Sequence, residues 1–227
     1  MRQRKFFEGV YEIEDEEGSH IATLSIAPGI IVYGEKIVKI GNDEYRIWNP
    51  YRSKIAAAII KGLKNFFIKP GWRILYLGAA SGTTVSHVSD IVGSEGIIYA
   101  VEVAHRPFRD FIEKVSGKRR NVVPILGDAR SVFEYSWLLQ EVETVYCDIA
   151  QPDEVSIAVM NADIFLKKGG FLVIALKASS VDSTRKPSEI FRREEANLEA
   201  TGRYRIEEIV DIEPYAMMHE LIISRKI

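Results

Sequence analysis

The sequence predicts an α/β fold in which a mostly parallel sheet with an antiparallel last strand follows a small antiparallel β domain. From residue 73 onward, short apolar runs alternate with amphipathic segments, as expected for repeated strand–helix units. The chain then ends on two successive strand-like runs, 204–212 and 220–224, so we expect the last strand to enter the sheet antiparallel. Residues 1–50 contain short strand-like runs at close spacing instead. We therefore expect a Rossmann-like domain over residues 51–227, preceded by a separate β domain.

Composition narrows the class of protein. Of 227 residues, 47% are hydrophobic and 27% charged, which is typical of a soluble globular chain. The net charge of −2 is low for a protein that binds nucleic acid unaided, because phosphate neutralisation supplies most of that affinity. The single cysteine, Cys147, and four scattered histidines provide neither a disulfide nor a metal site. No apolar run could span a bilayer, so we expect a cytoplasmic location and no membrane partner.

The first 50 residues consist of short apolar and alternating runs separated by turns. Strands are expected at residues 10–14, 20–26, 30–34, 36–40 and 44–48. Two interpretations are equally open: this β unit stabilises the main domain as a cap, or it provides a docking surface for a partner. In the second interpretation, Phe6, Phe7 and Trp48 are the candidate anchors.

The main domain begins after a linker at residues 49–52. Ser53 can cap a helix whose apolar residues extend from Ile55 to Phe67. Strands are then expected at residues 73–77, 97–101, 122–126, 144–149 and 171–176, with helices at residues 82–92, 106–115, 132–139, 153–165 and 188–200. Pro124 cannot donate a ladder hydrogen bond, which places its strand near an edge of the sheet.

The stretch at residues 74–84 indicates a ligand site. A buried strand stops at Gly78, small residues including Ala79 follow, and a helix then begins. Small residues allow a ligand to approach the backbone, and the first N–H groups of the helix have no partner of their own. In α/β sheets this turn holds adenosine-containing cofactors.

Carboxylates follow the next three strands of the predicted sheet. Glu102 can hold ribose hydroxyls, Asp128 can accept from an adenine amino group, and Asp148 ends the fourth strand. Each alone could be a helix N-cap, but three at one edge indicate a site. Such a site would repel a pyrophosphate and suits the positive sulfonium of S-adenosyl-L-methionine.

Several motifs resemble fibrillarin across nearly the whole chain. They are Leu75 to His87, Tyr99-Ala100-Val101-Glu102, Gly127-Asp128-Ala129, Asp148-Ile149-Ala150-Gln151-Pro152 and Lys167-Lys168-Gly169-Gly170. Tyr76 stands where most class I methyltransferases carry an acid, a departure that agrees with fibrillarin. The resemblance implies a class I methyltransferase sheet and S-adenosyl-L-methionine as cofactor.

The resemblance also assigns site residues. Around the cofactor it implies Thr83, Thr84, Glu102, Val103, Asp128, Ala129, Asp148, Ile149, Ala150 and Gln151, beside the turn residues Gly78 and Ala79. A catalytic Lys-Asp-Lys-His set maps onto Lys54, Asp148, Lys177 and His219. We expect Lys177 nearest the reacting hydroxyl with Asp148 orienting it, and Lys54 neutralising charge on the substrate backbone. His219 could equally be a surface histidine at a strand start.

The function implied is ribose 2′-O-methylation of rRNA, extending to tRNA, in a box C/D guide ribonucleoprotein. The implied partners are a Nop5-type scaffold, an L7Ae-type kink-turn-binding protein, a box C/D guide RNA and the target RNA. Partners that carry RNA affinity would explain the net charge of −2. The alternatives are a stand-alone methyltransferase acting on a protein side chain, and a non-catalytic scaffold subunit.

Overall fold

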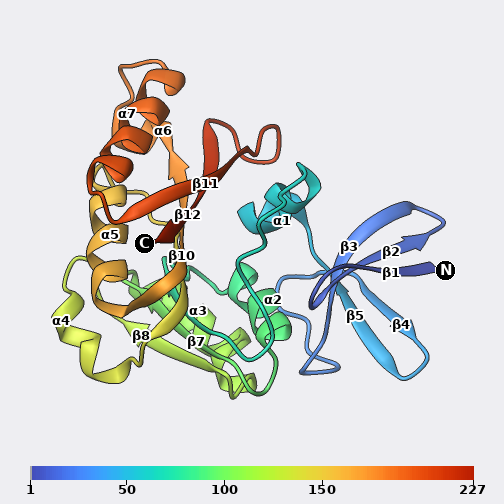
Figure 1. Ribbon diagram of the computed structural model, residues 1–227. Coiled ribbons are helices and arrows are strands. Elements are labelled where there is room, and N and C mark those ends of the chain that lie inside the picture. The colour runs from blue at the N-terminus through green and yellow to red at the C-terminus, as the bar shows by residue number, and fades with distance from the viewer. Residues whose placement is uncertain (1) are drawn as a thin grey trace.

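The N-terminal part of the chain forms a five-stranded antiparallel sheet. The computed structural model describes the backbone of residues 2–227 and the side chains from Gln3 onward. The strands are β1 (Arg2–Phe7), β2 (Val10–Asp15), β3 (Gly18–Leu24), β4 (Ile37–Ile40) and β5 (Asp43–Ile47), in the order β1-β2-β3-β5-β4. This sheet lies to one side of the larger α/β part, with α2 between them (Figure 1).

The rest of the chain builds a seven-stranded sheet in the order β11-β12-β10-β9-β6-β7-β8. Its strands are β6 (Arg73–Leu77), β7 (Ile97–Glu102), β8 (Val122–Leu126), β9 (Val142–Cys147), β10 (Leu166–Lys177), β11 (Tyr204–Asp211) and β12 (His219–Lys226). As predicted, the last strand, β12, is antiparallel to its neighbours, between β10 and β11. Pro124 lies in β8, an edge strand, also as predicted.

Helices cover both faces of this sheet. They are α1 (Lys54–Ile60), α2 (Thr83–Val92), α3 (His105–Lys114), α4 (Val132–Tyr135), α5 (Glu154–Phe165), α6 (Ala178–Val181) and α7 (Pro187–Ala200), with short 3-10 turns η1 (Pro50–Arg52), η2 (Ser116–Lys118) and η3 (Ser136–Leu138). Alternate residues of β6 face opposite ways: Ile74 and Tyr76 pack in one core with α1, α2 and α3, and Leu75 and Leu77 in the other with α4, α5 and α7. The fold is therefore the expected Rossmann-like α/β sheet.

The strand order places a ligand crevice at the end of β6. Strand β6 pairs in parallel with β7 on one side and with β9 on the other. The connection from β6 runs to β7, whereas β9 arrives later in the chain, so the strand order reverses here. Open α/β sheets bind ligands at the carboxyl ends of the strands at such a switch point.

Two expected elements differ in the structure. The predicted strand at residues 30–34 is wrong, because this segment is an irregular loop in which the Glu35 carboxylate accepts from the N–H groups of Val32 and Tyr33. The Ser53 cap is confirmed, with its Oγ accepting from the N–H of Ala56, but the helix ends at Ile60. Gly62 follows at φ +93°, a left-handed conformation that stops the helix before Phe67.

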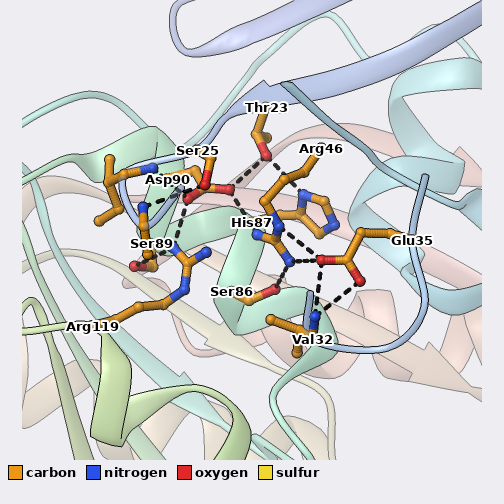
Figure 2. Close-up of polar contacts among 12 residues, drawn as sticks. Thr23, Ser25, Val32, Glu35, Arg46, Ser86, His87, Ser89, Asp90 and Arg119 are labelled. Atoms are coloured by element: carbon orange, nitrogen blue, oxygen red, sulfur yellow. Dashed lines mark hydrogen bonds and ion pairs between the residues drawn. The ribbon is translucent and has the colours of Figure 1, made fainter. Parts of the chain in front are cut away.

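Buried ion pairs join the two sheets (Figure 2). Arg46 of β5 is fully buried and donates to Glu35 at 2.5 Å and to Asp90 of α2 at 2.7 Å. Arg119, before β8, donates to the other oxygen of Asp90 at 2.6 Å. Two arginines and two carboxylates thus balance in charge within the interior, and Asp90 lies between both guanidinium groups. We call Glu35, Arg46, Asp90 and Arg119 the interface ion cluster.

His87 lies beside this cluster as a neutral, fully buried ring. Its Nδ1 lies 2.8 Å from Thr23 Oγ1 and its Nε2 2.8 Å from the Tyr33 hydroxyl. Thr23 donates its own proton to Asp90, so it accepts from an Nδ1–H, and Nε2 can accept from Tyr33. Burial, with Arg46 and Arg119 nearby, holds the pKa of His87 well below 6.5.

This neutral histidine predicts acid sensitivity. Below about pH 6.5 the unfolded chain binds a proton at this position and the folded chain does not, so the free energy of unfolding should fall by up to about 1.4 kcal/mol per pH unit. Above that pH the contribution is constant. The free energy of unfolding of His87→Gln, measured with guanidinium between pH 7 and pH 5, should therefore depend less steeply on pH than that of the wild type. The difference in slope should correspond to about one proton. Identical slopes for both proteins would contradict the assignment.

The predicted docking anchors on the N-terminal sheet are only partly available. Trp48 is 1% exposed and its ring stacks on His87 at 4.9 Å, so its prediction as a docking anchor is wrong. Phe7 stacks on Phe66 at 4.6 Å, whereas Phe6 remains 43% exposed. Trp48 therefore belongs to the contact between the two sheets. Among the described residues, no helix has the length and apolar character needed to cross a membrane.

Candidate active site

The turn after β6 requires glycine at its first position. Gly78 has φ +87°, and a Cβ built there would lie 2.1 Å from the carbonyl oxygen of Asp148. The N–H groups of Gly78 and Ala79 both donate to Val101 O. The backbone of the turn is thus pressed between the ends of β9 and β7, which brings Asp148 against the loop.

Glu102 fixes the same turn from the end of β7. Its Oε2 accepts from Ala80 N at 2.7 Å and its Oε1 accepts from Ala104 N at 2.8 Å. Ala80 itself has φ +47°, uncommon for a residue with a Cβ. Each carboxylate oxygen has a second lone pair, so Glu102 can hold the turn and still accept from a ligand hydroxyl.

One hollow of about 230 Å³ gathers the residues predicted to surround the adenosine. It is lined by Gly78, Ala80, Val101, Glu102, Val103, Gly127, Asp128, Ala129, Arg130, Asp148, Ile149, Ala150, Gln151 and Ile157. Three carboxylates and a turn with small side chains suit a nucleoside with a positive substituent. The residues present therefore fit S-adenosyl-L-methionine.

Asp128 is already engaged in the structure. It accepts from Arg130 at 2.6 Å, and this hydrogen bond lowers the pKa of Asp128 below its usual value of 3.8. Both side chains line the same hollow. Asp128 is therefore ionised at neutral pH and can act only as an acceptor, which an adenine amino group requires. Arg130 is not among the site residues expected from the sequence, although it lies only two residues from Asp128.

Two further hollows continue from the first, and all three meet at Asp148. The second, about 330 Å³, is lined by Arg52, Lys54, Tyr76, Gly78, Ala79, Ala80, Ser81, Thr83, Thr84 and Asp148. The third, about 440 Å³, is lined by Pro50, Tyr51, Arg52, Ser53, Lys54, Thr84, Asp148, Lys177, Tyr215, Ala216 and His219. One side of Asp148 thus faces the hollow expected to hold the cofactor. Another side faces the third hollow, which is lined by two lysines and a histidine.

Asp148 was expected to orient Lys177, but in the structure it forms an ion pair with Lys54. Its Oδ1 accepts from Lys54 Nζ at 2.6 Å, with both side chains about a quarter exposed. Lys54 is the first residue of α1, which Ser53 caps, and Ser53 Oγ accepts from Thr84 Oγ1 at the start of α2. These contacts fix Lys54 opposite the end of β9. Lys177 lies across the third hollow at the end of β10.

His219 lies directly beside Lys177, because the two residues pair across β10 and β12. Its Nδ1 is 2.7 Å from the carbonyl oxygen of Met217, so that nitrogen carries the proton and Nε2 keeps its lone pair. Burial, with Lys54 and Lys177 adding to it, lowers the pKa of His219 below 6.5. The structure thus gathers all four predicted residues, and the histidine among them is neutral at pH 7.

Two buried residues, Cys147 and Glu154, lie behind the site. Burial raises the pKa of the Cys147 thiol well above 9.0, so this thiol remains protonated and unreactive. Glu154, the first residue of α5, is fully buried with its carboxyl against the Asp148–Ile149 segment. Glu154 is not among the residues expected from the sequence, because an acid at a helix start is ordinarily a solvent-exposed partner of the helix dipole.

Comparisons with known proteins agree with this geometry. The family model described as Fibrillarin matches residues 1–227. A fibrillarin-like rRNA/tRNA 2′-O-methyltransferase of Pyrobaculum aerophilum is 52% identical over 220 residues, covering 96% of this chain and 93% of the relative. The structure of Aeropyrum pernix fibrillarin with natively bound S-adenosyl-L-methionine superimposes with a TM-score of 0.91 at 46% identity, covering 99% of this chain and 98% of the other.

A further solved structure is a fibrillarin/Nop5p complex. Its matching chain is 41% identical with a TM-score of 0.87, and the match covers 97% of this chain and 98% of that chain. The family match and the relatives at 41–52% identity extend over both sheets and over all three hollows that meet at Asp148. The chain therefore belongs to the fibrillarin family.

Proposed function

We infer that this chain is an S-adenosyl-L-methionine-dependent rRNA and tRNA ribose 2′-O-methyltransferase. The observation that carries the inference is the position of Asp148, where a hollow fitted to adenosine meets a hollow lined by Lys54, Lys177 and His219. A methyl acceptor bound in the second hollow would face a cofactor bound in the first. The relative from Pyrobaculum aerophilum carries this activity in its name.

The cofactor site uses side chains from three strand ends. We propose that Glu102 accepts from the ribose hydroxyls, Asp128 from the adenine amino group, and that residues 149–151 cover the adenosine. Gly78 and Ala79 leave space for the methionine part, and Thr83 and Thr84 line the continuation of the cavity. When bound, S-adenosyl-L-methionine supplies an electrophilic methyl group on a positive sulfur. The nearby carboxylates would stabilise that positive charge.

The reaction side must hold the substrate phosphate and remove one proton from the 2′-OH. We propose that Lys177 lies nearest the hydroxyl, and that Lys54, fixed by Asp148, faces the adjoining phosphate. The oxygen forms a bond to the methyl carbon while the methyl–sulfur bond breaks, and the hydroxyl proton leaves to a base. His219 supports this step, because its neutral Nε2 can accept a hydrogen bond or a proton beside Lys177.

We propose that RNA affinity comes from partners. The net charge of −2 leaves little electrostatic affinity for RNA. A fibrillarin/Nop5p complex supports a Nop5-type scaffold as one partner. We further propose an L7Ae-type protein, a box C/D guide RNA and a cytoplasmic location, where the free buried thiol of Cys147 suits a reducing compartment. We further propose that residues 1–50 and 51–227 form two domains.

Reconstitution tests this function. The isolated chain is expected to bind S-adenosyl-L-methionine but to methylate target RNA slowly, and the addition of both proteins and a guide RNA should raise the rate at least about 100-fold, since positioning supplies much of the barrier reduction. Mapping the labelled methyl group by nucleotide provides the readout. Label in protein would favour a protein methyltransferase, and no label with cofactor bound would favour a scaffold. Efficient methylation of bare RNA by the chain alone would contradict the guide-dependent mechanism.

A further inference from the structure

The Glu154 carboxyl lies buried directly behind the reacting edge. The residue is 0% exposed, and its Oε1 accepts from Ile149 N at 3.3 Å. Its Oε2 is buried and has no hydrogen-bond partner among the described residues. An ionised carboxylate with an unpaired oxygen in the interior would carry a large desolvation cost. A protonated carboxyl in the same place costs far less.

The surrounding charges also favour the protonated form. Burial, reinforced by the negative charge of Asp148, raises the pKa of Glu154 well above 4.5, against smaller opposing effects of Lys54 and the backbone N–H groups of Ile149 and Lys177. The other titratable neighbours, Tyr146 and Cys147, are buried and neutral themselves. Burial and charge thus both favour the protonated form of Glu154, in which Oε1, the acceptor from Ile149 N, is the carbonyl oxygen and Oε2 is the hydroxyl.

The position of this group links it to both strand ends that carry reacting residues. Ile149 directly follows Asp148 at the end of β9, and its N–H donates to the Glu154 carboxyl, whose pKa the backbone of Lys177 at the end of β10 also lowers slightly. An ionised Glu154 would place a second negative charge behind Asp148 and compete for Lys54. A neutral one can fix the backbone without altering the Asp148–Lys54 pair.

We propose that Glu154 is a positioning residue that works as a neutral acid: its carboxyl fixes the Asp148–Ile149 segment from behind, so that Asp148 alone supplies the negative charge beside Lys54. This inference rests on the proposed methyltransferase function. It concerns a residue that touches neither cofactor nor substrate, because the carboxyl is covered by the protein on all sides.

Three variants test the proposal. Glu154→Gln has the shape of the protonated acid, and we expect it to keep kcat within about threefold of wild type. Glu154→Asp keeps the acid but shortens its reach, and should lower kcat at least about tenfold, with the KM for S-adenosyl-L-methionine changed less than about threefold. Glu189→Gln, at the exposed start of α7, is the matched control and should change neither value. Assays use the reconstituted particle with guide RNA, below the unfolding temperature of every variant.

Infrared difference spectra of the isolated chain at pH 7 supply the second readout. The wild type minus Glu154→Gln spectrum should contain the carbonyl band of one protonated carboxyl. Its absence would overturn the neutral state, and so would a loss of kcat in Glu154→Gln equal to that in Glu154→Asp. Full kcat in Glu154→Asp would overturn the positioning role. If the wild-type particle itself fails to methylate ribose, the proposed function fails, while the infrared comparison still tests Glu154.

Discussion

Replacing Lys177 with methionine is expected to lower kcat about 10²–10⁴-fold, the usual range for loss of a group that acts on the transferred proton or its charge. Lys177 lies at the end of β10 in the hollow that also contains Asp148 and His219. Methionine keeps the length and apolar stem of lysine, so packing against β12 should persist. Because Lys177 does not line the adenosine hollow, the Kd for S-adenosyl-L-methionine should change less than about threefold.

Lys168→Met provides the matched control for this prediction. Lys168 lies on the same strand but is exposed at its opposite end. Single-turnover methylation by the reconstituted particle gives the rate, and calorimetric titration of the chain with S-adenosyl-L-methionine gives the Kd. If the two methionine variants methylate at equal rates, Lys177 has no part in the reaction.

Replacing Asp90 with asparagine is expected to lower the free energy of unfolding by about 3–5 kcal/mol, the cost of removing one partner from a buried ion pair. Asp90 accepts from Arg46 at 2.7 Å and from Arg119 at 2.6 Å, and all three side chains are completely buried. Without this carboxylate, two guanidinium groups face each other with only Glu35 to compensate. The N-terminal sheet and α2 should then separate more readily, since Arg46 is a contact between them.

Guanidinium unfolding of the full chain measures this effect. Asp110→Asn on the exposed face of α3 removes an i,i+4 pair with Lys114 at 3.5 Å, and should cost about 0.5 kcal/mol or less. A loss below about 1 kcal/mol in Asp90→Asn would show that the interface ion cluster does not hold the sheets together. In a double-mutant cycle, Arg46→Met and Asp90→Asn should cost less together than the sum of their separate effects.

Much of the fold was predictable from hydrophobic periodicity. The alternation of apolar runs and amphipathic segments after residue 73 indicates strand–helix repeats, and two terminal strands in succession indicate one antiparallel strand. Pro124 marks an edge strand for a local reason, since it lacks an N–H. The same reasoning gave a wrong prediction for residues 30–34. An apolar run does not show whether a neighbouring strand or a side chain such as Glu35 accepts the hydrogen bonds of its backbone N–H groups.

In the candidate site, the residues at the strand ends were predictable from the sequence, but the pairing between their side chains was not. Chemistry at strand ends is local in sequence, so Gly78, Glu102, Asp128 and Asp148 were identifiable, and parallel strands bring their carboxyl ends to one edge. Pairing between side chains is not local. Lys54 and Asp148 are 94 residues apart, and only the packing of α1 against the sheet shows that they form the ion pair.

The sequence alone determined the family, the polar edge at the carboxyl ends of the parallel strands, and the residues that converge on that edge. What only the tertiary structure decided is the environment of individual side chains. Trp48 lies at the contact between the two sheets, opposite charges balance around Asp90, and the Glu154 carboxyl is fully buried. The fully buried His87 and the partly buried His219 are both neutral. The physical reason is desolvation. The cost of a charge depends on everything packed within a few ångströms of it, and those neighbours come from distant parts of the chain.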